Sequence, residues 1–538
     1  GYDSVNRKHK EWLPYVDIVE DLGSLRVGDT TATKQYYLDS YPLDFPGITN
    51  VQDINAFSQK QFDSSPLNRI LKQAAPGSDW AMNQGNEIEF NYTSNTSLDE
   101  VRQFEVDLTE ATVNGIVTFE SILIEESPNI MYDVGELYKT TTYDENHPGT
   151  STKLHTVEEF KDKQGRVVLK RTYGPFDDDG NNEIDPGEEE LPHDTYYVYD
   201  DYGNLTYVLP PKMDATTSTL AELQGELDEL GYQYVYDHRN RLVEKKVPGK
   251  GLEYIVYNKL DQPVMTQDAV MRANGQWLFT KYDAFGRVAY TGMADLTVGR
   301  EQAQSNVENA AAQYEEPDNG YYTYDTYPSI AITPNEGYTM NFYDNYDFDL
   351  NGYTIPTTVL GQDVSMDVKG LPTAITTRVL VDGPERWVLT LMLYDDKGRV
   401  ILTGTINEYL GTMEIVETEL DFVGRAVRTR TMHSRGTDVV VTIDNYEYDH
   451  VGRLLKHTQC IGDHTMGESC TGPGELIAYN EYDDLGQLVQ KKVGGAPGTT
   501  YALTDGLQTV DYAYNIRGWL KSINQDQDNM DNDLFDFG

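Results

Sequence analysis

Positive charge is scarce in this sequence. It contains 42 Lys and Arg residues against 89 Asp and Glu residues, which gives a formal net charge of −47. A protein that binds nucleic acid directly needs clustered Lys and Arg to contact the phosphates, so we expect no nucleic-acid partner. An acidic surface keeps a large protein soluble and offers oxygen ligands to divalent cations.

Long hydrophobic runs are also missing. The most apolar stretch, residues 388–394 (VLTLMLY), has the length of a strand and falls short of the roughly 18 residues of a membrane helix. We therefore expect no membrane span. Hydrophobic residues make up only 38% of the chain, and 40 Tyr stand against 15 Phe. Such rings pack laterally and keep a hydroxyl in water, which favours a thin shell or solenoid over a compact sandwich.

The motifs of common enzymes are absent too. We find no nucleophile elbow, no phosphate-binding loop and no zincin helix. Paired carboxylates abound in so acidic a chain, so a pair is weak evidence for a hydrolase. We expect a protein that is not an enzyme and requires no cofactor.

A short repeated motif dominates the sequence. Its clearest copy is YDAFGRV, residues 282–288. Five further copies keep the frame: YDDYGNL from Tyr199, YDHRNRL from Tyr236, YDDKGRV from Tyr394, YDHVGRL from Tyr448 and YDDLGQL from Tyr482. Weaker copies are YDSVNRK from Tyr2, KDKQGRV from Lys161, YNKLDQP from Tyr257, MDVKGLP from Met366, LDFVGRA from Leu420 and YNIRGWL from Tyr514.

The motif predicts a strand, a tight turn and a returning strand. Tyr is a good strand residue, Asp bonds backbone N–H groups ahead of it, and Gly supplies the positive φ of a type I turn with a bulge. Where Gly is replaced, Asn or Asp stands in its place, and these tolerate that conformation best. The predicted structural turns are Asp200 and Gly203, Asp237 and Asn240, Asp283 and Gly286, Asp395 and Gly398, Asp449 and Gly452, and Asp483 and Gly486.

The spacing of the copies predicts one continuous all-β array. From Asp162 to Asn515 the steps between turns are 21 to 38 residues, apart from one of 84. Each unit is too small to bury a core alone, so neighbours must pair edge to edge. We divide the chain into residues 1–150, a first repeat with an accessory β segment, and residues 151–538, the array proper. The chain begins and stops beside repeats, so we interpret it as a fragment of a longer protein.

Three segments have helical spacing. Leu67, Ile70 and Leu71 follow a cap at Asp63 or Ser64 and predict a helix before residues 75–77. Two insertions into the array, residues 217–230 and 299–315, predict short helices. Strand-like alternation marks residues 86–92 and 113–124.

The tandem motifs resemble the RHS/YD-repeat family over most of the chain, from Tyr2 and then from residue 161 to 520. Residues 65–80, SPLNRILKQAAPGSDW, resemble the segment before the array in large secreted bacterial members. The resemblance implies a spiral of β-hairpins that closes into a hollow, cocoon-like shell. In polymorphic-toxin members this shell encloses a C-terminal toxin, and in animal relatives it serves adhesion. Nothing here matches the self-cleaving core segment of the toxin members, so no residue is assigned that activity.

Two acidic loops are candidate calcium sites. Asp347, Asp349 and Asn351 alternate before Gly352, as at the start of an EF-hand loop, but Thr358 stands at the twelfth position instead of Glu. The second set begins with Asp177 and Asp179 and continues through Asn181, Glu183 and Asp185. The alternative is a pair of solvated acidic loops.

Cysteine is nearly absent. Cys460 and Cys470 are the only two, with His457 and His464 nearby. A disulfide that closes the loop is the simplest interpretation in an exported protein. A zinc site and free thiols are the alternatives.

These features support a non-enzymatic shell that encloses or carries a C-terminal effector or toxin. We expect it to be secreted or at the cell surface of a bacterium, with the effector and the export machinery as partners. An adhesion or carbohydrate-binding scaffold with exposed aromatic rings is the alternative, and a glycoside-active enzyme is a distant third.

Overall fold

The fold is one long antiparallel sheet that follows the chain. The computed structural model describes residues 7–16, 30–149, 152–175, 190–318, 320–330, 337–348, 354–381, 384–463, 465, 467, 470, 472, 474–495 and 507–524. Within them, 27 strands form a single ladder, and each pairs with the next ladder strand along the chain. The all-β hairpin array that the repeat predicts is confirmed.

The ladder strands, in order, are β1 (Lys10–Trp12), β2 (Phe57–Phe62), β3 (Ile70–Ala74), β4 (Ile88–Ser94), β7 (Tyr138–Tyr143), β8 (Thr156–Lys161), β9 (Val167–Gly174), β10 (Leu191–Tyr199), β11 (Leu205–Leu209), β12 (Tyr232–Tyr236), β13 (Leu242–Lys246), β14 (Glu253–Tyr257), β15 (Pro263–Gln267), β16 (Gln276–Tyr282), β17 (Val288–Asp295), β20 (Gly337–Asp344), β23 (Val368–Val379), β24 (Arg386–Tyr394), β25 (Val400–Asn407), β26 (Thr412–Leu420), β27 (Ala426–Arg435), β28 (Asp438–Tyr448), β29 (Leu454–Gly462), β30 (Glu475–Tyr482), β31 (Leu488–Val493), β32 (Gln508–Tyr514) and β33 (Leu520–Ile523).

The other elements are the hairpins β5 (Glu105–Val113) with β6 (Ile116–Ile124), β18 (Pro317–Asp318) with β19 (Tyr321–Tyr322), and β21 (Thr358–Val359) with β22 (Gln362–Asp363), the helices α1 (Thr30–Ser40), α2 (Leu220–Glu226), α3 (Ala269–Ala273) and α4 (Arg300–Asn309), and the 3-10 turns η1 (Pro42–Asp44), η2 (Val51–Asp53) and η3 (Pro211–Met213).

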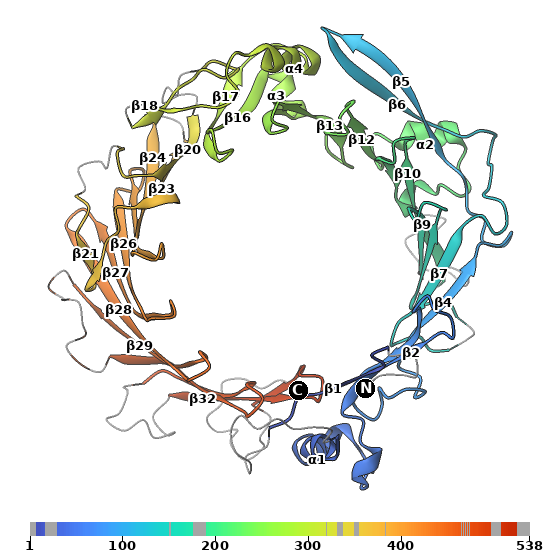
Figure 1. Cartoon of the computed structure of the whole chain (residues 1–538), viewed down its shortest axis with the longest axis horizontal. Coiled ribbons are helices and arrows are strands. Elements are labelled where there is room, and N and C mark those ends of the chain that lie inside the picture. Colours follow the sequence, from blue (N-terminus) through green and yellow to red (C-terminus); the bar gives the residue numbers. More distant parts are fainter. Residues whose placement is uncertain are drawn as a thin grey trace.

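The sheet curves into a ring around an open centre (Figure 1). Strands lie about 4.8 Å apart, so 27 of them make a band roughly 130 Å long, which corresponds to a ring about 40 Å across. The first and last ladder strands lie near each other (Figure 1), although no strand pairing joins β33 to β1 among the described residues.

Side chains connect the two ends of the band. The backbone N–H of Ile516 donates to Asp44 Oδ2 at 2.8 Å, and the Tyr41 hydroxyl donates to Gln487 Oε1 at 3.0 Å. Ile516 also packs in a hydrophobic cluster with Tyr37 and Phe45. These contacts hold the ends together without a continuous ladder.

The cores lie between the ring and the elements outside it. The β5–β6 hairpin, α2, α4 and the β21–β22 hairpin lie outside the band (Figure 1), and each covers a hydrophobic cluster on its outer face. In β16, Trp277, Phe279 and Lys281 point to this cover and are buried. The alternate side chains are half-buried and point to the open centre.

Two of the helices that the sequence predicts in the array are present. α2 begins with a capping box, in which Thr219 and Glu222 bond each other's backbone N–H groups. α4 is shorter than expected and ends at Asn309. Beyond it, the backbone N–H of Glu315 donates to Tyr282 O at 2.7 Å, so contact with the sheet replaces further helix.

The helix expected after Asp63 is wrong, because β2 and β3 form a hairpin there. The Asp63 N–H donates to Arg69 O at 2.9 Å, Arg69 Nε donates to Asp63 Oδ2 at 3.0 Å, and Asn68 has φ +56°. This is the repeat turn with a longer loop between its Asp and the residue with positive φ. Leu67 lies exposed in that loop, so its helical spacing to Ile70 is coincidental.

Candidate functional site

Both carboxylate oxygens of the repeat-turn aspartate accept hydrogen bonds from within the same turn. In the copy at Asp283, Oδ1 accepts the N–H groups of Phe285 and Arg287, both at 2.9 Å. Oδ2 accepts Arg287 Nε at 2.6 Å. Gly286 has φ +78°, a conformation that strains any residue with a Cβ. The carboxylate therefore closes the turn and holds the arginine.

The other predicted turns share this geometry. The N–H of the Asp donates to the carbonyl four residues ahead, and the ladder shifts register just before the Asp, which gives the expected bulge. The φ values are +85° at Gly203, +57° at Asn240, +73° at Gly398, +96° at Gly452 and +91° at Gly486. In the copy at Tyr2–Lys8, residues 2–6 lie outside the described residues.

The copy at Met366 is a correction. Asp367 closes no such turn; instead Tyr343 and Asp344 end β20, and Gly370 and Leu371 lie in the returning strand β23. Asp344 Oδ1 accepts the Gly370 N–H at 2.6 Å, and Gly370 has φ +82°. One repeat is thus split by residues 345–369, which carry the β21–β22 hairpin.

The arginine of one repeat packs on the tyrosine of the next. Its guanidinium lies between its own Asp and the following Tyr ring, where burial beside a carboxylate strengthens the cation–π attraction. The pairs and their guanidinium-to-ring distances are Arg166 with Tyr199 at 5.0 Å, Arg241 with Tyr257 at 4.9 Å, Arg287 with Tyr343 at 4.2 Å, Arg425 with Tyr448 at 5.0 Å and Arg453 with Tyr482 at 4.6 Å.

The motif tyrosines also bond backwards to the previous repeat. Each hydroxyl donates to a backbone carbonyl of the previous return strand, so the expectation that it stays in water is wrong. The bonds, 2.5 to 3.1 Å long, are Tyr199 to Val167, Tyr236 to Leu205, Tyr257 to Leu242, Tyr282 to Pro263, Tyr343 to Val288, Tyr394 to Pro372, Tyr448 to Ala426, Tyr482 to Leu454 and Tyr514 to Leu488. Sequence reasoning missed this link because its acceptor lies in another repeat.

Asp395 and Asp449, two of the turn carboxylates, have a lowered pKa. At Asp449, desolvation favours the neutral form, but the backbone N–H and guanidinium bonds from Arg453 outweigh it and lower the pKa to about 2. The pKa of Asp395 falls for the same reasons, with Arg399 as the partner. An anion with its oxygens already bonded is poorly suited to accept a proton from a substrate.

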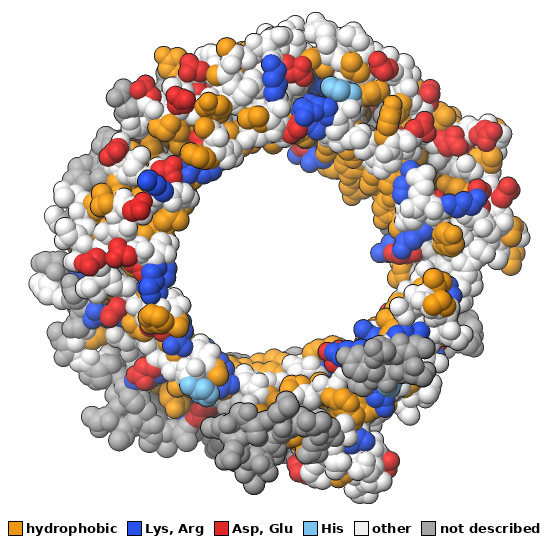
Figure 2. Space-filling view, in the orientation of Figure 1, with side chains coloured by type: hydrophobic (Ala, Val, Ile, Leu, Met, Phe, Trp, Pro, Cys, Tyr) orange, Lys and Arg blue, Asp and Glu red, His pale blue; other side chains and the backbone are white. Residues whose placement is uncertain are grey.

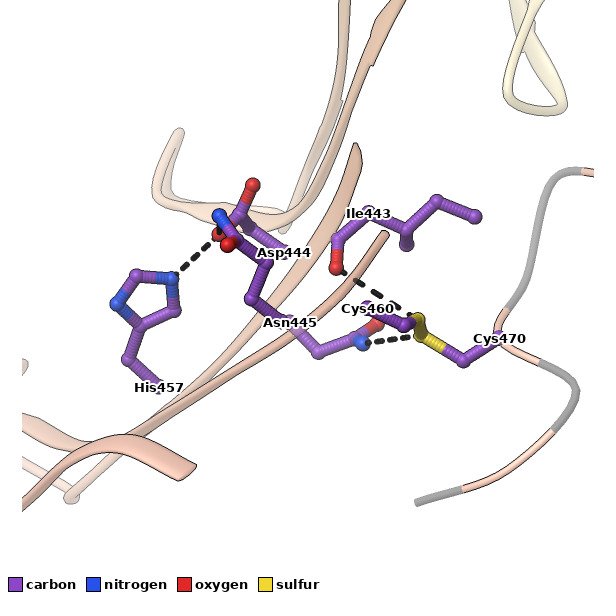
Figure 3. Close-up of a disulfide and its surroundings, with 7 residues drawn as sticks. Ile443, Asp444, Asn445, His457, Cys460 and Cys470 are labelled. Atoms are coloured by element: carbon purple, nitrogen blue, oxygen red, sulfur yellow. Dashed lines mark hydrogen bonds and ion pairs between the residues drawn. A yellow bond between two sulfur atoms is a disulfide. The ribbon is translucent and has the colours of Figure 1, made fainter. Parts of the chain in front are cut away.

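The cysteine prediction is confirmed. Cys460 and Cys470 form a disulfide with Cα atoms 6.0 Å apart (Figure 3). His457 bonds Asp444 Oδ1 at 2.7 Å and stacks on Tyr446, away from the sulfur atoms (Figure 3). The zinc alternative therefore fails, since both cysteines are bonded to each other.

The calcium candidates fall almost wholly outside the described residues. Asp349, Asn351, Asp177 and Asp179 are among the residues not described, as are Asn181, Glu183 and Asp185. Asp347 is described, and its N–H donates to Asn345 Oδ1 at 2.9 Å. Elsewhere in the described ranges, no group of three His, Cys, Asp or Glu could hold a metal ion.

The inner wall of the ring is an uncovered surface that the fold creates (Figure 1). Hydrophobic side chains are visible on it around the open centre, with Lys, Arg, Asp and Glu side chains between them (Figure 2). One continuous row crosses six strands without a charge. It comprises Met392, Thr403, Val416, Thr431, Thr442 and Ile461. Neighbouring threonines on this wall bond each other, as Thr291 and Thr339 do at 2.7 Å.

The motif and the geometry together define the chain as a YD-repeat hairpin array. Its first 94 residues match a family model described as a domain of unknown function, DUF6443. No curated protein matches the chain. No helix in the described part is long and apolar enough to cross a membrane.

Solved structures with a similar trace include crystal structures of TcdB2-TccC3-TEV and of TcdB2-TccC3 without its hypervariable C-terminal region. The first is 12% identical with a TM-score of 0.29, and the second is 13% identical with a TM-score of 0.23. The matches cover 92% and 93% of this chain but only 25% and 32% of those chains. At these scores the similarity carries no argument, and the fold rests on the strand pairing itself.

Proposed function

We propose that this chain is a non-enzymatic shell that encloses or carries an effector or toxin segment. The observation that carries the proposal is the inner wall, an uncovered surface that includes a six-strand row of Thr and aliphatic side chains without a charge. The elements that bury apolar surface all lie on the other side of the sheet.

Such a wall suits a polypeptide that is not compactly folded. Threonine and tyrosine hydroxyls bond exposed backbone groups, and aliphatic side chains cover apolar ones, without selecting one sequence. The uncharged row also avoids ion pairs that would hold a passenger too tightly to release. The Asp-closed turns and the outer hydrophobic clusters hold each strand in place, so the wall is rigid.

The chemistry of the turns supports a role without catalysis. The aspartates that recur along the array are bonded to their own turns, which leaves them a structural function. The disulfide fits an oxidising compartment. Together these favour a secreted or cell-surface bacterial protein whose partners are an effector segment and export machinery.

Cross-linking tests the proposal. A photo-reactive residue is placed at Thr405, which faces the open centre, or at Glu447, which is exposed on the opposite face. The protein used is the full gene product that contains this chain and whatever follows residue 538. We expect cross-links from position 405, and not from position 447, to the following segment, as identified by mass spectrometry. Equal labelling from both positions, or labelling from neither, would contradict an enclosed passenger.

An adhesion scaffold would behave differently in the same preparation. It would bind a glycan through exposed rings such as Tyr202 and Phe285, which are 68% and 81% exposed. Loss of that binding on replacing both rings by Ala, with no cross-links from the inner wall, would favour the adhesion function.

A further inference from the structure

Some repeats lack the arginine that packs on the next tyrosine ring, and the copy at Tyr199 is one of them. In the copy at Tyr199, Asn204 stands where most copies have Arg. Asn204 Nδ2 reaches Asp200 Oδ2 at 2.9 Å, but its side chain is too short to cover the next ring, Tyr236. Among the described contacts, Tyr236 has no cation over its face and Asp200 has no cationic partner. Asp200 is only 5% exposed, so it is a buried carboxylate without a counter-charge.

A cavity of about 350 Å³ lies at this place. Asp200 and Tyr236, the two groups that hold the guanidinium in other repeats, both line it. The opposite wall comes from one face of the β5–β6 hairpin, with Glu110 and Phe119 in register. Tyr202, mostly exposed, lies at the turn that borders the cavity.

A second substitution accompanies the first. In other repeats the arginine crosses to the glycine of the next turn; Arg425 Nη1, for example, would lie 3.2 Å from a Cβ at Gly452. The residue that corresponds to that glycine here is Asn240, whose Oδ1 accepts Asn204 Nδ2 at 3.2 Å. A side chain at 240 would crowd an arginine at 204. The pair Asn204 and Asn240 therefore keeps the arginine position open.

We propose that this cavity binds a guanidinium group, the side chain of an arginine from a partner polypeptide. The guanidinium would bond Asp200 Oδ2 and stack on the Tyr236 ring, as the chain's own arginines do elsewhere. Glu110 supplies a second carboxylate from the hairpin wall. A planar, forked cation fits this pairing of a carboxylate and a ring, whereas a lysine ammonium is a point charge that keeps its water more strongly.

Calorimetric titration with N-acetyl-L-arginine amide tests the site on the intact chain. We expect saturable binding that weakens as NaCl is added, because the contact is ionic. N-acetyl-L-citrulline amide has the same length and no charge, and it should bind at least tenfold more weakly. N-acetyl-L-lysine amide should fall between the two. Equal heats from the arginine and citrulline compounds would overturn the proposal.

Restoring the repeat consensus provides the matching variant. Asn204→Arg with Asn240→Gly places the chain's own guanidinium in the cavity, and binding should fall at least tenfold while the thermal midpoint stays unchanged or rises. Gln262→Arg adds the same charge at the corresponding position of another repeat and should leave binding unchanged. Undiminished binding to the double variant would overturn the proposal.

A variant outside the turns covers the case in which the double variant fails to fold. Glu110→Gln changes an exposed hairpin residue without touching a turn. It should weaken arginine binding three- to tenfold and leave the circular dichroism spectrum unchanged. Unchanged affinity in this folded variant would refute the placement of the ligand between hairpin and turn.

Discussion

Replacing turn glycines by alanine separates two contributions to the repeat. At Gly203, with φ +85°, an added Cβ meets nothing within 4 Å. At Gly486, with φ +91°, the same Cβ would lie 2.9 Å from Arg453 Nη1. Both alanines are strained by the backbone, but only the second also displaces the arginine of the previous repeat.

The expected magnitudes follow from these contacts. A residue with a Cβ in the left-handed region costs about 1–2 kcal/mol relative to glycine. That is about a 5- to 30-fold increase in local opening, since 1.4 kcal/mol is a factor of ten. Gly486→Ala should add about 0.5–1 kcal/mol, because the guanidinium that lies 4.6 Å from the Tyr482 ring must move away.

Hydrogen exchange measured by mass spectrometry is the suitable assay, because repeat arrays open locally and a single unfolding midpoint would average over them. Turn amides should exchange about 5- to 30-fold faster in Gly203→Ala, and a further two- to fivefold faster in Gly486→Ala. Gly203→Asn is the control and should change exchange least, since Asn240 already occupies this conformation at φ +57°. Unchanged exchange in Gly203→Ala would refute the turn argument, and equal effects of the two alanines would refute the arginine link.

Three further outcomes are expected. Tyr448→Phe removes the hydroxyl that donates to Ala426 O at 2.9 Å and should cost about 1 kcal/mol of local stability, read by exchange of β27 and β28 amides; Tyr409→Phe, at a 55% exposed site, should be neutral. The pKa of Asp449, about 2, lies below its usual value, so its stabilising contribution is present above about pH 4 and is lost as the pH falls towards 2. A fluorescence titration should therefore show no opening of this turn at pH 5. An opening at pH 5 would contradict the conclusion that the ionised Asp449 carboxylate closes the turn. Reduction of Cys460–Cys470, which closes a short loop, should cost at most about 3 kcal/mol locally. It should increase proteolysis near that loop but not in β24–β26, and equal cleavage in both places would be contrary to this expectation.

The turns were predictable because their determinants are local. Asp-x-x-Gly places acceptor, donors and positive φ within five residues, so the spacing alone indicates the hairpin. The disulfide was predictable for a similar reason, as Cys460 and Cys470 are few and close in sequence. α2 was predictable from the three- and four-residue spacing of the apolar residues in 217–230.

What the sequence did not reveal depends on partners in other repeats. The acceptor of the Tyr448 hydroxyl is a carbonyl at Ala426, and nothing near Tyr448 in the sequence points to it. The split repeat was not predicted, because an insertion separates Asp344 from Gly370 in the sequence. The hairpin at Asp63 escaped because its turn is longer than the frame, and helical spacing then gave the wrong prediction.

The Asp-closed turns all lie at one edge of the band. Successive turns of an antiparallel meander alternate between the two edges, so every Asp-closed turn lies on one side, while α2, α3, α4 and the disulfide loop connect strands on the other. An insertion at the opposite edge leaves the strand register and the Asp-closed turns intact. It costs only a loop-closure free energy of about 0.6 kcal/mol for each doubling of loop length. At the Asp-closed edge the insertion of residues 345–369 keeps the Asp344–Gly370 hydrogen bond, whereas Asn204 and Asn240 open a defined gap. Differences in what such a ring binds should therefore arise from the variable edge, from the inner wall, or from repeats that depart from the motif.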